Sequence, residues 1–224
     1  MKRVVIPELL DVDAGSPAEI ATALRDLQHI NSWFGGVRTT ALMVMDVARK
    51  VGVNRLSMVE VAAGAGFVPQ AAARELRRNG VELKVTLLDR ASSHLSNGDG
   101  NGMGRVSADA MALPFRDASF DLVSCCLFAH HLSPEQIVTF VNEGLRVARH
   151  ALLINDLVRH PLHLALSYAS LPLYRSRITH HDAPASVKRA YTVDEMQAIL
   201  GNTRARNVDV ERRAIYRMGV VAWK

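Results

Sequence analysis

The stretch that decides the fold is Leu56-Ser-Met-Val-Glu-Val-Ala-Ala-Gly-Ala-Gly-Phe67. Its first half is an apolar run, which is typical of a parallel strand that is buried on both faces of a sheet. The run reaches an acid, Glu60, and then passes into a turn where Gly64 and Gly66 give the backbone freedom to change direction. Small residues in such a turn let a ligand approach the main chain closely.

The segments after this turn predict a nucleotide-type ligand site. Pro69 suits the first turn of a helix, and Asn79-Gly80 supplies a stop signal. A glycine pair alone would fit any tight strand-to-helix turn. However, Lys84-Val-Thr-Leu-Leu-Asp89 is a second buried strand that ends in an acid. In an open parallel sheet both acids lie at the carboxyl edge, where ligands bind, and a carboxylate there can accept the hydroxyls of a ribose.

The glycine pattern separates two kinds of nucleotide site. A dinucleotide-binding turn has the pattern Gly-x-Gly-x-x-Gly, and Pro69 stands where its third glycine would be. The run instead resembles the first motif of class I S-adenosylmethionine (SAM)-dependent methyltransferases, acid-x-Gly-x-Gly-x-Gly. Glu60 is the acid, and Gly64 and Gly66 are the last two glycines. Ala62 stands where the family has its first glycine.

A second segment extends the resemblance. Asp109-Ala-Met-Ala-Leu-Pro-Phe115 and the following Phe120-Asp-Leu-Val123 are similar to segments of the menaquinone and ubiquinone biosynthesis branch of the family. Three motifs in the right order are a much more specific signal than one glycine pair.

The resemblance implies a role for each acid toward SAM, the expected cofactor. Asp109 would bond the adenine amino group, Asp89 would hold the ribose, and Glu60 would orient the turn and the amino end of the cofactor. The other expected cofactor-binding residues flank these acids or lie in the linker before the sheet: Ala62, Ala63, Gly64, Gly66, Arg90, Ala110, Cys126, Trp33 and Arg38. For Cys126 a small buried filler is the alternative interpretation.

The family fold implied is α/β and Rossmann-like. It has a seven-stranded, mostly parallel sheet in the order 3-2-1-4-5-7-6, with helices on both faces and an N-terminal helical lid. A chain of 224 residues with 49% hydrophobic content is long enough for one such domain and short for two. We therefore expect a single domain over residues 1–224, with a lid over 8–51, a core over 52–224 and an insert over 157–190.

Capping boxes mark three helix starts outside the first motif: Ser16-Pro-Ala-Glu19, Ser133-Pro-Glu-Gln136 and Thr192-Val-Asp-Glu195. The first predicts a helix to about Ile30, followed by a linker with Trp33 and Arg38. Its aromatic and cationic groups suit a closing element. An ordinary helix-helix turn with the tryptophan in the core is the alternative.

Histidines crowd the segments expected to face the cofactor turn: His130, His131, His160, His163, His180 and His181. Histidine is the usual proton acceptor near neutral pH, and an O-methylation needs one proton removed. His130 and His131 directly follow the fourth strand, so they are candidate catalytic bases or substrate-orienting groups; capping of the loop is the alternative. His181 beside Asp182 is a third candidate.

We expect no metal site. His160-Pro-Leu-His163 lacks a clear third ligand. Cys126 or Leu127 stands where metal-dependent catechol methyltransferases place an acid after the fourth strand.

The resemblance implies SAM-dependent methyl transfer to a small, largely apolar acceptor, first of all the hydroxyl of a phenolic, quinone or polyketide-type metabolite. Leu162 to Tyr174 is an apolar and aromatic stretch that could wall such a pocket, although ordinary helix packing explains it equally well. Carbon methylation of an activated ring is an alternative. A non-catalytic SAM-binding accessory protein is another, for which Ala62 and a short helix after Asp89 leave room.

Composition excludes several other classes. The net charge of +5 comes from scattered basic residues without interleaved aromatics, so no nucleic-acid partner is expected. No apolar run is long enough for a membrane helix or a signal peptide. The adjacent Cys125 and Cys126 cannot easily bridge, which favours reduced thiols. We therefore expect a cytoplasmic monomer or homodimer.

Overall fold

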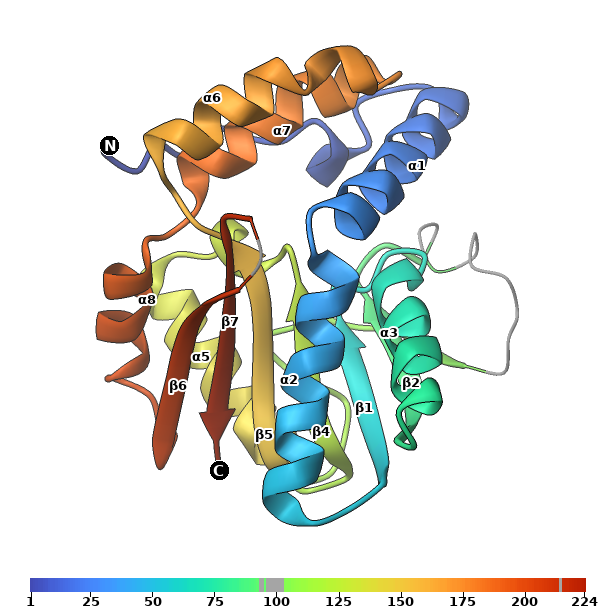
Figure 1. The fold of residues 1–224 in the computed structure, drawn as a ribbon, viewed down its shortest axis with the longest axis vertical. Coiled ribbons are helices and arrows are strands. Elements are labelled where there is room, and N and C mark those ends of the chain that lie inside the picture. Colours follow the sequence, from blue (N-terminus) through green and yellow to red (C-terminus); the bar gives the residue numbers. More distant parts are fainter. Residues whose placement is uncertain (93–94, 96–102, 214) are drawn as a thin grey trace.

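The computed structural model describes residues 1–92, 95, 103–213 and 215–224, and its centre is a seven-stranded sheet (Figure 1). The order β3-β2-β1-β4-β5-β7-β6 is the one expected from the sequence. The neighbouring strands β3, β2, β1, β4 and β5 run parallel, whereas β7 is antiparallel to β5 and β6 is antiparallel to β7. The strands are β1 (Arg55–Val61), β2 (Glu82–Asp89), β3 (Gly104–Ser107), β4 (Phe120–Cys126), β5 (Ala148–Leu157), β6 (Asn207–Arg213) and β7 (Arg217–Trp223).

Helices cover both faces of this sheet because the central strands are apolar on both sides. In β1, Met58 joins the core under α2 (Gly36–Val51) and α3 (Phe67–Arg78). Its neighbour Val59 joins the core on the other face, under α5 (Pro134–Val147) and α8 (Val193–Leu200). Successive residues of a strand point to opposite faces, so an unbroken apolar run predicts this double burial.

The three capping boxes all form, at Ser16, Ser133 and Thr192. Each satisfies backbone N–H groups that the first helical turn would leave without partners. The helix α1 (Pro17–Trp33) continues past Ile30 because the chain reverses direction only at Gly35, which has a φ of 77°. The expected short helix after Asp89 lies largely outside the described residues.

Three helices lie across the carboxyl edge of the parallel strands (Figure 1). They are α1, α6 (Pro161–Ala169) and α7 (Arg177–Arg189), with the short 3-10 turns η1 (Leu10–Val12) and η3 (Leu171–Leu173). We call residues 8–33 and 161–189 the cap. Among the described helices, none is both long and apolar enough to cross a membrane.

Side-chain caps hold the parts of the cap together. Asp182 on α7 accepts hydrogen bonds from the backbone N–H groups of Leu9 and Leu10, at 2.8 and 3.0 Å. Asp26 on α1 accepts from the N–H groups of Arg175 and Ser176, at 3.0 and 2.9 Å. The N-terminal segment and the insert after β5 therefore form one layer, although about 150 residues separate them in the sequence.

The expected lid segment 8–51 divides between two layers. Its first part, through α1, lies over the strand edge, whereas α2 lies on a face of the sheet (Figure 1). Met43, Val44 and Val47 give α2 an apolar side that is fully buried against the sheet. Burial of this side makes α2 part of the core, so of the expected lid segment only the part through α1 lies over the strand edge.

Candidate active site

The turn after β1 leaves its backbone open to a ligand. Gly64 and Gly66 both adopt positive φ angles, 51° and 74°. A Cβ at Gly66 would lie 2.5 Å from Cδ1 of Leu87, so packing against β2 requires a glycine there. A Cβ at Gly64 would meet no heavy atom of the described residues within 4 Å. Gly64 therefore faces open space at the N-terminus of α3.

Ala62 occupies the place of the missing first glycine of the motif. Its φ angle is 53°, in the left-handed region that glycine enters freely. A non-glycine residue costs about 1–2 kcal/mol in that region because Cβ crowds the following carbonyl oxygen. The backbone at Ala62 thus adopts the left-handed conformation that a glycine would adopt freely, and the alanine is strained there.

Asp89 connects β2 to the glycine turn. Its Oδ2 accepts a hydrogen bond from the Gly64 N–H at 2.8 Å, and its Oδ1 accepts from the Ala91 N–H at 2.9 Å. The carboxylate oxygens have further lone pairs, so the same group can shape the turn and contact a ligand. Asp109 holds its own turn through the Met111 N–H, at 2.8 Å, and its side chain is exposed.

Glu60 is a buried acid with an unused oxygen. Its side chain is 1% exposed, and Oε2 has no hydrogen-bond partner among the described residues. Burial raises the pKa of Glu60 to about 7, and the Ser124 hydroxyl on β4 offsets only part of this effect. A buried carboxyl group without a partner is costly, and a cationic ligand group beside it would relieve that cost.

A cavity of about 1010 Å³ separates the strand ends from the cap. Ligand pockets usually measure about 300–1,000 Å³, so this one has room for a cofactor and a second molecule. Apolar side chains of the cap, including Leu27, Leu166 and Leu173, line one side of it. Most of the residues expected at the site also line it: Glu60, Ala62, Ala63, Gly64, Asp89, Arg90, Asp109, Ala110, Cys126, His130 and His131.

Four expected site residues are not among those that line the cavity: Gly66, Trp33, Arg38 and His181. Gly66 packs against Leu87 and shapes the turn after β1 instead. Trp33 is 58% exposed and stacks on His29, with ring centroids 5.3 Å apart. The exposed Arg38 starts the outer side of α2. The His181 side chain is 42% exposed and bonds its neighbour Asp182 at 2.8 Å. The last three therefore lie outside the cavity lining in the part of the chain that the structure describes.

His130 lies between two carboxylates. Its Nδ1 is 2.7 Å from Asp156 Oδ1, and its Nε2 is 3.3 Å from Glu8 Oε1, in a geometry that falls short of a hydrogen bond. Burial alone would lower the pKa of His130, but Asp156 and Glu8 outweigh it and raise the pKa to about 10. Without another ligand the ring is protonated at neutral pH, which is the wrong state for a general base.

His131 has the same type of environment closer to the surface. Its Nδ1 is 3.0 Å from Asp11 Oδ2, and its Nε2 is 3.8 Å from the Glu8 oxygen that faces His130. The two imidazole rings are tilted, with centroids 4.2 Å apart. Burial raises the pKa of Glu8, but the nearby rings of His130 and His131 and the Ser186 hydroxyl together bring it below its usual range. Glu8, His130 and His131 are called the Glu-His-His cluster below.

A buried arginine fastens α1 to the sheet. Arg217 on β7 is 1% exposed and donates to Asn31 Oδ1 at 2.8 Å and to Asn155 Oδ1 at 3.2 Å. The Cys126 sulfur lies 3.7 Å from this guanidinium, and burial raises the pKa of Cys126 to about 12. Cys125 and Cys126 are both free thiols, as expected.

Four charged residues that surround the cavity or support its lining were not expected from the sequence: Glu8, Asp11, Asp156 and Arg217. Asp156 comes at the carboxyl end of β5, as Glu60 and Asp89 do on β1 and β2, so the same pattern could have found it. Glu8 and Asp11 carry no comparable signal. They reach the site because contacts with α7, among them those of Asp182 with Leu9 and Leu10 and of Ser186 with Glu8, hold the N-terminal segment there.

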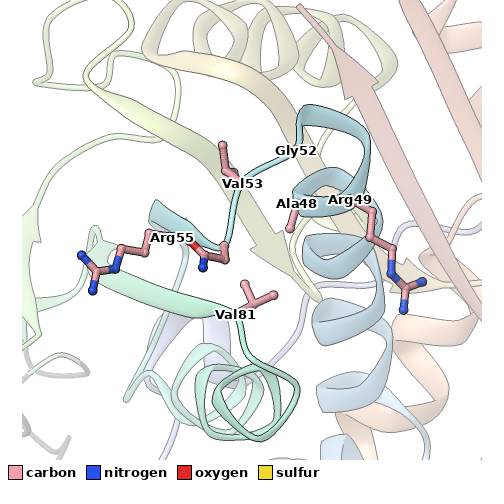
Figure 2. Close-up of a pocket in the computed structure, with 7 residues that line it drawn as sticks. Ala48, Arg49, Gly52, Val53, Arg55 and Val81 are labelled. Carbon is pink, nitrogen blue, oxygen red and sulfur yellow. The ribbon is translucent and has the colours of Figure 1, made fainter.

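A second hollow lies near the start of β1, at the opposite edge of the sheet (Figure 2). Its lining is largely apolar, and the side chains of Arg49 and Arg55 point in opposite directions in Figure 2. Arg55 pairs with Glu82 at 3.1 Å on the surface. With its two cations turned apart, this hollow lacks the convergent polar groups of the large cavity.

Comparison with known families agrees with this geometry. Residues 59–151 match the sequence model of the family described as methyltransferase domain. This stretch is therefore similar to a methyltransferase domain. The match begins in β1 and ends in β5, so it includes the glycine turn, Asp89 and Asp109. It also includes His130 and His131. A comparison with curated proteins finds no match.

Solved structures of methyltransferases share the fold of this chain. The plantazolicin methyltransferase BpumL, solved with SAH, is 9% identical, with a TM-score of 0.70, over 96% of this chain and 94% of that chain. A SAM-dependent methyltransferase from Aquifex aeolicus is 18% identical, with a TM-score of 0.57, over 80% and 88%. Human N-acetylserotonin methyltransferase, solved with SAM, is 14% identical, with a TM-score of 0.64, over 89% and 54%. At these identities the likeness establishes the fold.

Proposed function

We propose that the protein transfers the methyl group of SAM to a hydroxyl on a small, largely apolar acceptor bound under the cap. One observation carries this proposal. A single cavity has the open glycine turn with its acids at one wall, apolar cap side chains at another and the Glu-His-His cluster among its lining. Two binding environments of different polarity suit a polar cofactor and an apolar acceptor.

The glycine-turn wall supplies groups for each part of SAM. The Asp89 carboxylate is the proposed partner of the ribose hydroxyls, and Asp109, with the Ala110 backbone beside it, is the proposed partner of adenine. The unpartnered Oε2 of Glu60 suits the ammonium group of the methionine part. Ala62, Ala63 and Gly64 leave the backbone accessible between these acids, and Arg90 and Cys126 complete the proposed cofactor wall.

The cap wall supplies an apolar environment for the acceptor. Leu27, Leu166 and Leu173 come from α1, α6 and η3, and they give the side of the cavity away from the sheet an apolar lining. An apolar body with one hydroxyl, such as a phenol, a quinol or a polyketide-type ring, fits this combination with the Glu-His-His cluster. Two similar structures are named for N-acetylserotonin and plantazolicin, which supports a search among organic metabolites.

SAM, when bound, supplies an electrophilic methyl group on a positively charged sulfur. The acceptor hydroxyl loses its proton, its oxygen forms the new C–O bond as the C–S bond breaks, and SAH is released. The protein's task is to position the oxygen, exclude water and remove the proton. The Glu-His-His cluster is the proposed place of proton removal, and the branch resemblance supports phenols and quinols as the first acceptors to test.

Two measurements test this function. Calorimetry with SAM and SAH on the full chain should show one binding site. Labelled-methyl transfer to a panel of phenols, quinols and polyketide-type rings should yield methyl ethers. Absence of SAM and SAH binding would refute the proposal. Methyl carried on ring carbon would replace O-methylation by C-methylation, and binding without turnover on any acceptor would support the accessory role.

A further inference from the structure

We propose that Glu8, His130 and His131 bind a divalent transition-metal ion beside the acceptor part of the cavity. The inference rests on the proposed function for what the ion does, and on the geometry of the cluster for where it binds. Two imidazoles and one carboxylate form a ligand set that zinc and related ions use in catalytic sites, where further positions stay open for water or substrate.

The ligand atoms are already placed at metal-site spacing. The Nε2 atoms of His130 and His131 lie 3.3 and 3.8 Å from the same Glu8 oxygen, Oε1. All three potential ligand atoms lie within 4.8 Å of one another. Metal bonds of about 2.0–2.2 Å at tetrahedral angles place neighbouring ligand atoms about 3.4 Å apart. Small rotations of the side chains would thus be enough to close the site.

Both histidines are oriented in the way that metal-binding histidines are. Their Nδ1 atoms face the carboxylates of Asp156 and Asp11, at 2.7 and 3.0 Å. A carboxylate at Nδ1 fixes the proton there and leaves the lone pair of Nε2 for the metal. The Ser186 hydroxyl donates to Glu8 Oε1 at 2.8 Å and orients the third ligand.

A second, independent observation points to a missing ligand. His130 is 2% exposed, and its Nε2 has Glu8 Oε1 at 3.3 Å but no partner with hydrogen-bond geometry in the part of the chain that the structure describes. Buried polar atoms almost always have partners, so an orphan atom that lines a cavity indicates an occupant. A proton on Nε2 would relieve part of the charge, whereas a metal ion would satisfy Nε2 of both histidines and Glu8 together.

The local charge also suits a dication. Three carboxylates, those of Glu8, Asp11 and Asp156, surround the two rings. Arg189 offsets one of them, at 3.4 Å from Asp11. An ion at this place would lower the pKa of an acceptor hydroxyl that approaches it, which supplies the proton-removal step without a free histidine base. Mg²⁺ prefers oxygen ligands, so it serves as a control ion.

Metal binding is tested on the full chain without SAM. After treatment with a chelator, the protein is titrated with Zn²⁺ by calorimetry and with Co²⁺ by visible absorption. We expect one ion per chain, with intense visible bands for Co²⁺ and no comparable binding of Mg²⁺. Failure of the wild-type protein to bind both Zn²⁺ and Co²⁺ would overturn the proposal.

Variants locate the ion. Glu8→Gln and His131→Ala should each weaken Zn²⁺ binding more than about a hundredfold, and Asp11→Asn, behind His131, about 10- to 100-fold. His150→Ala is the matched control, because His150 begins β5 at the opposite edge of the sheet. Unchanged Zn²⁺ affinity in Glu8→Gln, His131→Ala and Asp11→Asn would refute the site. A loss of Zn²⁺ affinity in His150→Ala alone would place the ion elsewhere and also refute it.

SAH affinity separates the two proposals. Each variant should still bind SAH, which shows that it is folded. If Glu8→Gln or His131→Ala loses SAH binding as well as metal binding, Asp11→Asn, at a more exposed position, is the variant that tests the metal site. SAH binding without metal binding in the wild type contradicts only the metal site. Metal binding without SAM or SAH binding contradicts only the proposed methyl transfer.

Discussion

The two walls of the cavity are built in different ways. The cofactor wall comes from strand ends and their turns, and its shape depends on backbone angles at Ala62, Gly64 and Gly66. The part of the proposed acceptor wall that holds the Glu-His-His cluster comes from an N-terminal segment, the loop after β4, the end of β5 and α7, and it depends on paired buried charges. The first wall is local in sequence, whereas the second exists only in the folded chain.

The difference predicts where mutations act. Backbone conformation contributes small, independent free-energy terms of about 1–2 kcal/mol per strained residue. Removing one member of a buried charge pair leaves its partner uncompensated and costs about 3–5 kcal/mol. Substitutions in the acceptor wall should therefore endanger the fold, whereas those in the cofactor wall should mainly change ligand affinity.

The most severe test of this comparison is Asp156→Ala. Asp156 is 1% exposed and accepts hydrogen bonds from the backbone N–H groups of His130 and Leu157, at 3.0 and 2.7 Å. Without Asp156, these two N–H groups and the His130 ring are buried without their partner, so the free energy of unfolding should fall by about 3–5 kcal/mol. Urea denaturation measures this. The exposed ion-pair acid Asp117 is the control, and Asp117→Ala should cost less than about 1 kcal/mol. Equal losses would contradict the comparison.

A pH-dependent effect comes next, at Glu60. Its pKa rises from 4.5 to about 7 on folding, so the folded state holds the proton more tightly than the unfolded state. The stabilising contribution is complete below pH 4.5 and is lost as the pH rises to about 7, a change on the order of 3 kcal/mol. Glu60→Gln should remove this dependence and be more stable than the wild type at pH 8.

Urea midpoints at pH 5 and pH 8 measure the effect of Glu60→Gln. The exposed Glu82 on β2 provides the control, since Glu82→Gln should leave the pH dependence as it is. SAM affinity should rise with pH through about 7 in the wild type, because the carboxylate form attracts a cationic ligand. A wild-type stability that is flat between pH 5 and pH 8 would contradict the burial effect.

The third substitution, Asp89→Ala, should reduce affinity more than stability. It removes the acceptors for the Gly64 and Ala91 N–H groups and the proposed partner of the ribose. SAH binding, measured by calorimetry, should weaken at least about tenfold, or 1.4 kcal/mol. Asp194→Ala, at an exposed acid in the first turn of α8, should bind SAH as the wild type does. An unchanged affinity in Asp89→Ala would remove the cofactor assignment.

The smallest expected effect is a gain, in Ala62→Gly. Glycine relieves about 1–2 kcal/mol of strain at a φ of 53° and loses about 0.4–1 kcal/mol through the freer unfolded chain, for a net gain of about 0.5–1 kcal/mol. The Tm should rise by roughly 1–4 °C. Ala118→Gly, at a φ of 51° before β4, is the matched control for strain. Both should stabilise the protein, but only Ala62→Gly should alter SAH affinity.

Local patterns were enough for one half of the site. The acid and glycine order predicted β1, the turn and α3, and the second apolar run placed Asp89 at the same edge. The resemblance extended this to the sheet order. Asp156 was missed although its strand, β5, also carries an acid near its carboxyl end. Trp33 was placed at the ligand because aromatic and cationic neighbours resemble a lid; the helix instead turns the ring toward His29 and solvent.

Periodicity and turn chemistry act between neighbouring residues, so the order of amino acids alone determined the first two strands, the capped helices and the glycine turn, and the family resemblance implied the order of the sheet. Tertiary structure decided the rest. Glu8 meets His130 across more than a hundred residues of chain because tertiary contacts, such as those of Asp182 with Leu9 and of Asp156 with the His130 ring, hold both in place. Such contacts depend on how distant segments pack and on which charges lose their water together, and no local pattern records either property.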